Sequence, residues 1–176
     1  MGLFTKHTIE SAPAASRPLL TGIKSKFGFI PTMFDYMAGA PTTIEAYLQL
    51  NELVSKTSFS VSDQQIALMA VSVENECDFC VKAHKAIGKM KGANLETLLA
   101  LSEGREIVNS KDRALVDFVR LVVKERGRLT LGDQEKFIKA GFTQQNILEV
   151  MLIVSIKTLS NYINHLTQPE VNSELR

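Results

Sequence analysis

The chain has 176 residues, and its 20 lysines and arginines nearly balance 19 aspartates and glutamates, so the formal net charge is +1 at pH 7. This balance gives no basic field that would gather phosphates, and we expect no nucleic-acid partner. With 45% hydrophobic residues, the chain fits one domain and can bury a sizeable core. Its longest apolar runs, residues 66–73 and 150–156, fall far short of the roughly 20 residues that span a bilayer, so we expect no membrane association.

The N-terminal residues carry no recognisable targeting signal. They lack the apolar segment and small-residue cleavage site of a secretory peptide, and Lys6 stands where a myristoylation signal has serine or threonine. The two cysteines of the chain are too few to staple a secreted fold. We therefore expect a cytoplasmic protein.

Hydrophobic residues recur at spacings of three and four along most of the chain, which predicts an all-α fold. The predicted helices, eight or nine in number, cover about residues 13–26, a short segment ending near 38, then 41–55, 62–73, 76–90, 94–102, 111–126, 130–140 and 143–162. The helix over 62–73 is apolar nearly all round, so it should be central.

Polar pairs mark the starts of two of these helices. Ser62 with Gln65 has the pattern of a capping box, and Asn75 with Asp78 fits the cap of the next helix. The Ala-Val-Ser-Val of residues 70–73 is echoed by the Ile-Val-Ser-Ile of residues 153–156. This echo leaves open whether the helical unit is duplicated.

Both cysteines lie close in sequence to one of only three histidines. At about 100° per residue, Cys77, Cys80 and His84 fall on one face of the helix predicted over 76–90, and the lysines of that helix fall on the other. Residues three or four apart on a helix have Cβ atoms about 5 to 6 Å apart, so Cys80 can meet both Cys77 and His84. The three side chains should therefore face the core or a cleft together.

This arrangement favours a redox-active thiol pair. A disulfide across so short a loop adds only about 2 kcal/mol of stability, so a structural role explains the pair poorly. The positive end of the helix and a nearby imidazole both favour a thiolate, which can attack a peroxide or a disulfide. Position at the helix start favours Cys77 as the more acidic thiol, whereas contact with His84 favours Cys80.

Other interpretations of the same residues stay open. The cysteines could be inert, because free cysteine is among the most buried residue types. A zinc site would need a fourth ligand beside the cysteines and His84, and only His7 or His165 could supply it as imidazole. Covalent haem attachment, by contrast, is excluded, because it requires histidine directly after the second cysteine, where Val81 stands.

The motif Cys-x-x-Cys-x-x-x-His at a helix start, preceded by an apolar helix and by Asn75, resembles the AhpD-like alkyl hydroperoxidases of the carboxymuconolactone decarboxylase superfamily. Further similarities follow in the family's order: Phe-Ile-Pro (29–31) with Ala-Pro (40–41), Ala-Gly-Phe (140–142) with Glu-Val (149–150), and Asn-Tyr (161–162) with Asn164. The resemblance covers about residues 25–170. We therefore expect a single domain over 1–176, in which residues 1–24 form an N-terminal extension.

The resemblance implies an all-helical homo-oligomer that reduces peroxides through its cysteine pair. In that family the second cysteine, here Cys80, attacks the peroxide. The first, here Cys77, resolves the product and donates a proton, and the histidine, here His84, belongs to a proton relay. The family's reductant is an external thiol or lipoyl protein. Because the sequence has no nucleotide-binding fingerprint, we expect no bound cofactor, and we expect no metal.

Two positions depart from the family pattern. The family's relay often begins with a glutamate at the position where this chain has Gln65. An amide cannot carry a proton as a carboxylate does, so either Glu74 or Glu149 serves instead, or peroxidase activity is weak. An alternative interpretation is that Gln65 belongs to the capping box with Ser62 and has no role in the active site. Phe79 stands between the cysteines where the family usually has tyrosine, which makes the site drier.

Two alternative functions remain open at this stage. The superfamily also contains decarboxylases of lactone acids, which generally lack the cysteine pair. A non-enzymatic redox-switch or interaction protein would need only a reversible disulfide. Sustained turnover with peroxide and reductant would distinguish a peroxidase from such a switch.

Overall fold

The computed structural model describes residues 3–175, and within this range it contains nine α-helices, two short 3-10 helices and no β-strand. In chain order the elements are η1 (Ala14–Ser16), α1 (Arg17–Phe27), α2 (Thr32–Met37), α3 (Pro41–Ser55), α4 (Val61–Glu74), α5 (Asp78–Met90), α6 (Leu95–Glu103), α7 (Ser110–Lys124), α8 (Leu131–Lys139), α9 (Gln144–Thr167) and η2 (Ser173–Leu175). The predicted all-α class and number of helices are confirmed.

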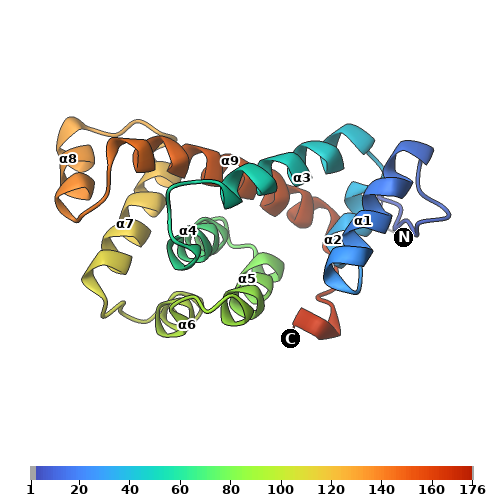
Figure 1. The fold of residues 1–176 in the computed structure, drawn as a ribbon, viewed down its shortest axis with the longest axis horizontal. Helices are drawn as coiled ribbons and strands as arrows, with labels where there is room; N and C mark the ends of the chain where they lie inside the picture. Colours follow the sequence, from blue (N-terminus) through green and yellow to red (C-terminus); the bar gives the residue numbers. More distant parts are fainter. Residues whose placement is uncertain (1–2, 176) are drawn as a thin grey trace.

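Two helices organise the fold (Figure 1). α9 is the longest helix and runs through much of the molecule, with α3 alongside part of it. α4 lies in the centre, where it packs against α5, α7 and α9. α8 lies at one end of the molecule and α1 at the other, and η2 returns to α5. The helix α5 is thus held by α4, α6 and the C-terminal segment.

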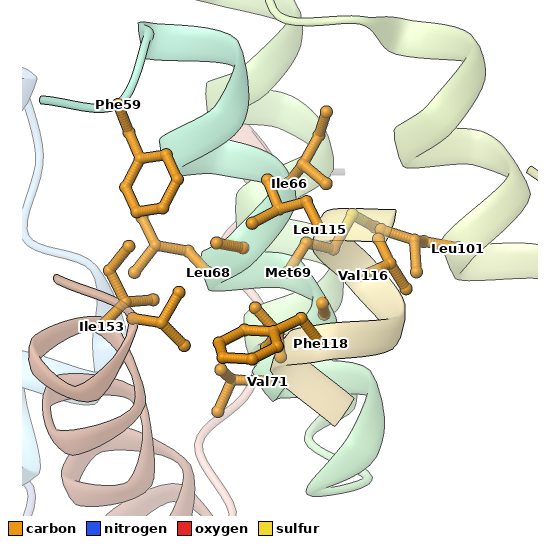
Figure 2. Close-up of a cluster of buried hydrophobic side chains, with 14 of the residues drawn as sticks. Phe59, Ile66, Leu68, Met69, Val71, Leu101, Leu115, Val116, Phe118 and Ile153 are labelled. Carbon is orange, nitrogen blue, oxygen red and sulfur yellow. The ribbon is translucent and has the colours of Figure 1, made fainter. Parts of the chain in front are cut away.

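The larger hydrophobic core forms around α4. Figure 2 shows Ile66, Leu68 and Met69 of α4 together with Val116 of α7 and Ile153 of α9. Each of these side chains is at most 4% exposed. Truncating a buried leucine or isoleucine typically costs about 2 to 5 kcal/mol, so this core fixes the position of α4. The central place predicted for this helix is confirmed.

A second, smaller cluster of buried side chains surrounds the thiols. It contains both cysteines and Phe79, with Leu20 from α1, Phe34 from α2 and Leu175 from η2. Segments from both ends of the chain therefore enclose the start of α5. The division into an extension over 1–24 and a core over 25–170 stays a prediction.

The cap of α4 differs from the predicted one. The N-cap residue is Ser60, whose hydroxyl accepts a hydrogen bond from the Asp63 amide at 3.1 Å. Ser62 instead accepts the backbone N–H of Asn94 at 2.9 Å. The predicted capping box of Ser62 and Gln65 is therefore wrong, because the Ser62 hydroxyl is engaged by the loop before α6.

The predicted cap of α5 is wrong as well. The side-chain amide of Asn75 donates to Asn161 Oδ1 at 3.0 Å. The helix begins at Asp78, and Cys77 is its N-cap residue, without a capping hydrogen bond from the side chain. Cys77 therefore stands just before the helix rather than within it.

By length and composition, α9 could also cross a membrane. Core helices of folded proteins share this property, and α9 packs against α2, α3, α4 and α7. The sequence echo thus lies on two helices that pack against each other, α4 and α9. A duplication of the helical unit stays a prediction.

Candidate active site

The turn between α4 and α5 sets the positions of both cysteines. Glu76 in this turn has a left-handed backbone conformation, with φ of 55°. The backbone N–H of Cys77 then bonds back to the Ser72 carbonyl at 2.9 Å. Cys77 consequently stands at the N-cap of α5 and Cys80 in its first turn. Both side chains are 2% exposed, and both are free thiols.

Asn164 of α9 bridges the two thiols. Its Nδ2 lies 3.2 Å from the Cys80 sulfur and 3.7 Å from the Cys77 sulfur. Its Oδ1 is buried and has no hydrogen-bond partner among residues 3–175. Asn161, on the same helix, accepts the Asn75 amide, and its own Nδ2 is buried without a hydrogen-bond partner among residues 3–175. Amide donors beside a sulfur favour the thiolate over the thiol.

His84 has both ring nitrogens engaged. Nδ1 lies 3.1 Å from Gln65 Oε1, and Nε2 lies 3.0 Å from Lys157 Nζ. An ammonium group can only donate, so Nε2 accepts from Lys157 and the Nδ1–H donates to Gln65. Burial and the positive charge of Lys157 hold the pKa of His84 well below its ordinary value. The imidazole is therefore neutral.

Lys157 of α9 is the buried cation of the site. It is 2% exposed, and among residues 3–175 no carboxylate lies within ion-pair distance of its ammonium. Burial opposes its charged form, but the charges of Cys80 and Tyr47 raise its pKa above the ordinary value. A buried ammonium without a carboxylate needs another negative group, and Cys80 can provide one.

The two thiols differ in acidity. Interaction with Cys77 lowers the pKa of Cys80 to about 5 against the effect of burial, and the positive charge of Lys157 contributes to this lowering. The same interaction between the two cysteines, together with burial, raises the pKa of Cys77. Cys80 is thus poised as the thiolate and Cys77 as the thiol. These contacts outweigh the position of Cys77 at the helix start.

Two of the predicted supporting residues do lie at the site. Gln65 is 3% exposed and binds His84, so it faces the site and not the helix cap. Phe79 is 7% exposed and packs in the smaller cluster with both cysteines. A phenylalanine there supplies apolar surface and no hydroxyl.

The two carboxylates considered as proton carriers lie elsewhere. Glu74, the last residue of α4, pairs with Lys124 of α7 at 3.6 Å. Glu149 accepts the hydroxyl of Ser58 at 2.6 Å near the start of α9. Neither carboxylate hydrogen-bonds to His84, whose ring nitrogens contact Gln65 and Lys157 in the part of the chain that the structure describes.

The remaining histidines do not complete a zinc site. His7 Nδ1 lies 3.2 Å from the Ser11 carbonyl, and His165 is exposed beside Tyr162. Within residues 3–175, no three side chains of histidine, cysteine, aspartate or glutamate are grouped so that they could hold a metal. The zinc interpretation of the cysteines therefore lacks its fourth ligand.

Three polar residues of α9 were not identified as site residues from the sequence. Lys157 was missed, and the two asparagines were assigned only to a family signature. The buried positions in the second half of α9 are Ile153, Ile156, Lys157, Ser160, Asn161 and Asn164. A lysine and two asparagines on the buried stripe of an apolar helix are the signal that could have found them, because buried polar groups need partners.

The lysines of α5 border a separate surface groove of about 1210 Å³. Lys82, Lys85 and Lys89 line it together with Glu170 and Glu174 from the C-terminal segment. These lysines lie on the opposite face of α5 from Cys80 and His84. The groove is therefore not the thiol site.

Residues 41–125 match the family model described as the Carboxymuconolactone decarboxylase family. No curated protein matches the chain. Among solved structures, a peroxidase-related protein from Ralstonia eutropha JMP134, described as an alkylhydroperoxidase AhpD core, is similar with a TM-score of 0.85 and 22% identity. That match covers 98% of this chain and 93% of the other.

Two further structures have the same fold. A peroxidase-related protein from Silicibacter sp. TM1040 has a TM-score of 0.79 and 17% identity, with 93% of this chain and 87% of the other covered. A variant of the debrominase Bmp8 in complex with 2,3,4-tribromopyrrole has a TM-score of 0.79 and 18% identity, covering 100% of this chain and 95% of the other. The predicted AhpD-like fold is confirmed.

Proposed function

We propose that this chain, a member of the carboxymuconolactone decarboxylase family through its residues 41–125 and AhpD-like in fold, is a thiol-dependent peroxidase. Its substrates are small organic hydroperoxides, and Cys77 and Cys80 cycle between dithiol and disulfide. The observation that carries the proposal is the single amide of Asn164, which lies within hydrogen-bond distance of both buried sulfurs. One sulfur can react while the other stands beside it.

The reaction follows from the different acidities of the two thiols. The Cys80 thiolate attacks the terminal peroxide oxygen, the O–O bond breaks, and Cys80 becomes a sulfenic acid while an alkoxide leaves. Cys77 then attacks the Cys80 sulfur, an S–S bond forms, and the sulfenic hydroxyl leaves as water with the Cys77 proton. The peroxide gains two electrons and the thiol pair loses two.

The surroundings of the thiols favour an uncharged substrate. The smaller cluster around them is apolar, and Phe79 adds no hydroxyl. Asn164 Oδ1 has no hydrogen-bond partner among the described residues, so it can accept the O–H of a hydroperoxide while Nδ2 holds the sulfur. An organic hydroperoxide suits the apolar surroundings because it is neutral, and its one O–H can donate to Asn164 Oδ1.

The proposal includes a reductant and an assembly. Because the thiol pair holds only two electrons, an external thiol or lipoyl protein must restore it after each cycle, in the reducing cytoplasm. A homo-oligomer would cover apolar side chains that α9 leaves exposed, namely Leu148, Tyr162 and Leu166. Analytical ultracentrifugation of the purified chain tests the assembly.

Sustained turnover tests the function. Wild-type protein is mixed with cumene hydroperoxide and excess dihydrolipoamide, and the peroxide that remains is measured over time. We expect many equivalents of peroxide to be consumed per protein, and we expect Cys80→Ser to abolish this consumption. Oxidation of one equivalent followed by no turnover would instead indicate a redox switch, and no thiol loss would favour a decarboxylase-like member of the superfamily.

The same dithiol could also remove halogen from an aromatic ring, an activity named for the similar debrominase Bmp8. In that reaction the bromoarene gains a hydrogen in place of bromine, bromide leaves, and the two thiols become a disulfide. Bromide release from 2,3,4-tribromopyrrole by reduced protein tests this second activity.

A further inference from the structure

Among residues 3–175, no carboxylate pairs with Lys157 or hydrogen-bonds to His84, whose Nδ1 faces the Gln65 amide. Peroxide reduction still needs a positive charge beside Cys80 and a proton for the departing alkoxide. We propose that Lys157 provides both, as the counter-ion of the Cys80 thiolate and as the acid that protonates the alkoxide. This inference rests on the proposed peroxidase function for its second half.

The position of the ammonium group supports this role. Lys157 Nζ lies 3.0 Å from His84 Nε2, and the side chain is 2% exposed. One ammonium hydrogen is directed to the imidazole, which leaves the others for Cys80. Cys80 contacts Asn164 at 3.2 Å, and Asn164 and Lys157 both lie on the buried face of α9. Among residues 3–175, Lys157 has no carboxylate partner, whereas a buried lysine ordinarily has one.

His84 serves as a positioning residue in this arrangement. Its Nδ1–H is held by Gln65 at 3.1 Å, so its Nε2 carries a lone pair and no proton. The imidazole therefore cannot donate a proton toward the thiols, but it can hold the ammonium in place. The proton that the alkoxide needs lies on Lys157.

The charges balance at each step of the cycle. In the reduced state, the site contains a thiolate on Cys80 and an ammonium on Lys157. Attack on the hydroperoxide gives Cys80 sulfenic acid and an alkoxide, and the alkoxide takes a proton from Lys157 to leave as alcohol. Cys77 thiol and the sulfenic acid then form the disulfide and water, beside a neutral amine.

The return step restores the starting charges. An external dithiol reduces the disulfide to two thiols and becomes a disulfide itself. The Cys80 thiol then transfers its proton to the Lys157 amine. The buried site thus has no net charge in either the dithiol or the disulfide state, which avoids the cost of a lone buried ion.

Titration of the thiolate tests the counter-ion. Ultraviolet absorbance of the thiolate is followed against pH in reduced wild-type protein, Lys157→Met, Lys157→Arg and Lys82→Met, the last a matched control on the outer face of α5. We expect Lys157→Met to raise the midpoint for Cys80 by about 1 to 3 pH units. Lys157→Arg and Lys82→Met should leave it near the wild-type value, and an unchanged midpoint in Lys157→Met would overturn the proposal.

Single-turnover oxidation by cumene hydroperoxide tests the acid. Arginine keeps the charge but gives up its proton far less readily, so Lys157→Arg should form the disulfide roughly 100-fold more slowly than wild type. A wild-type rate in Lys157→Arg would refute the acid role. If wild-type protein reduces no peroxide while the thiolate midpoint still depends on Lys157, the proposed function fails and the counter-ion stands.

A third measurement uses only wild-type protein, so its result does not depend on whether a variant folds. The 13C NMR signal of the Lys157 ε-carbon is compared in the dithiol and disulfide states of wild-type protein at neutral pH. We expect a shift to the neutral amine on oxidation. An ammonium signal in both states would contradict the proposed cycle.

Discussion

Gln65 and Lys157 hold opposite sides of the His84 ring. The amide oxygen of Gln65 accepts the Nδ1–H, and the ring then offers its Nε2 lone pair to the ammonium. A glutamate at position 65 would accept the same hydrogen but would also add a negative charge. Burial and the charge of Lys157 keep His84 neutral, and the amide of Gln65 adds no negative charge that would favour its protonation.

Replacing Gln65 by glutamate tests this description. A carboxylate beside Nδ1–H stabilises the imidazolium, so Gln65→Glu should raise the pKa of His84 by about 1 to 3 units. Titration of the imidazole C–H signals by NMR measures the change. Gln64→Glu is the matched control, since Gln64 binds the Phe59 carbonyl instead. Equal shifts in both variants would show a general effect of added charge and contradict the contact.

Local spacing predicted three of the site residues but could not predict Lys157. Cys77, Cys80 and His84 lie within two turns of chain, so helical geometry alone places them near one another. Lys157 lies 73 residues after His84, and its place depends on how α9 packs against the rest of the fold. Only the buried stripe of α9 indicated that its lysine and asparagines need partners.

At the scale of elements, helix positions followed from periodicity, whereas helix caps did not. Ser60 with Asp63 and Ser62 with Gln65 both fit a capping box, and they are only two residues apart. The structure uses Ser60, because the Ser62 hydroxyl accepts the backbone N–H of Asn94. Such a choice depends on a loop that packs from elsewhere in the chain, so the local pattern cannot make it.

Removing the cap of α4 should lower stability. Ser60→Ala leaves the Asp63 amide without its side-chain acceptor, and we expect the free energy of unfolding to fall by about 1 kcal/mol. Urea denaturation of reduced protein measures the change. Ser60→Asp should restore most of the loss, and Ser155→Ala, on the exposed side of α9, should change stability by less than about 0.5 kcal/mol. Equal effects of both alanines would contradict the cap.

Close packing of α5 on α6 gives a second prediction. A Cβ atom on Gly88 would lie 2.3 Å from Leu98 Cδ1, and Leu98 is fully buried. Gly88→Ala should therefore lower the free energy of unfolding by about 1 to 3 kcal/mol. Gly22→Ala, at a helical glycine with open space around it, should instead be neutral or stabilise by up to about 1 kcal/mol.

A double variant separates the clash from other effects. If the methyl group of Gly88→Ala meets Leu98, then Leu98→Ala removes the obstacle. The cost of the double variant should be less than the sum of the single costs by about 0.5 to 3 kcal/mol. If the free-energy costs of the two single variants simply add, the methyl group of Gly88→Ala does not contact Leu98.

At the scale of the whole molecule, the net charge of the chain is close to zero, and the proposed net charge of the buried site is zero as well. The buried thiolate and ammonium balance each other, and the neutral His84 adds no charge. Composition predicted a chain without a strong field, but it could not locate a buried ion pair inside it. The packing of α4, α5 and α9 produces that pair.

The buried neutral histidine should make stability depend on pH. The pKa of His84 is about 6.5 in the unfolded chain and lower in the folded protein. Between these two pKa values the unfolded state binds a proton that the folded state does not, so acid favours unfolding. The lowered pKa of Cys80 acts in the same direction. The free energy of unfolding of reduced protein should therefore fall as the pH drops from about 7 to 5, by up to about 1.4 kcal/mol per unit for each group.

Urea denaturation across this pH range measures the dependence. His84→Gln should reduce the slope, whereas His165→Gln, which changes an exposed histidine, should leave it as in wild type. Greater stability at the acidic end would contradict a neutral buried imidazole.

The proposed peroxidase reaction requires that Cys80 and Cys77 reduce a hydroperoxide as a pair. The most direct measurement is the loss of free thiols when one equivalent of cumene hydroperoxide is added to fully reduced wild-type protein. We predict that two thiols per chain disappear, far faster than from a free model thiol, and that peptide mapping finds a Cys77–Cys80 disulfide. Thiol loss no faster than that of the free model thiol, or oxidation without this disulfide, would contradict the claim.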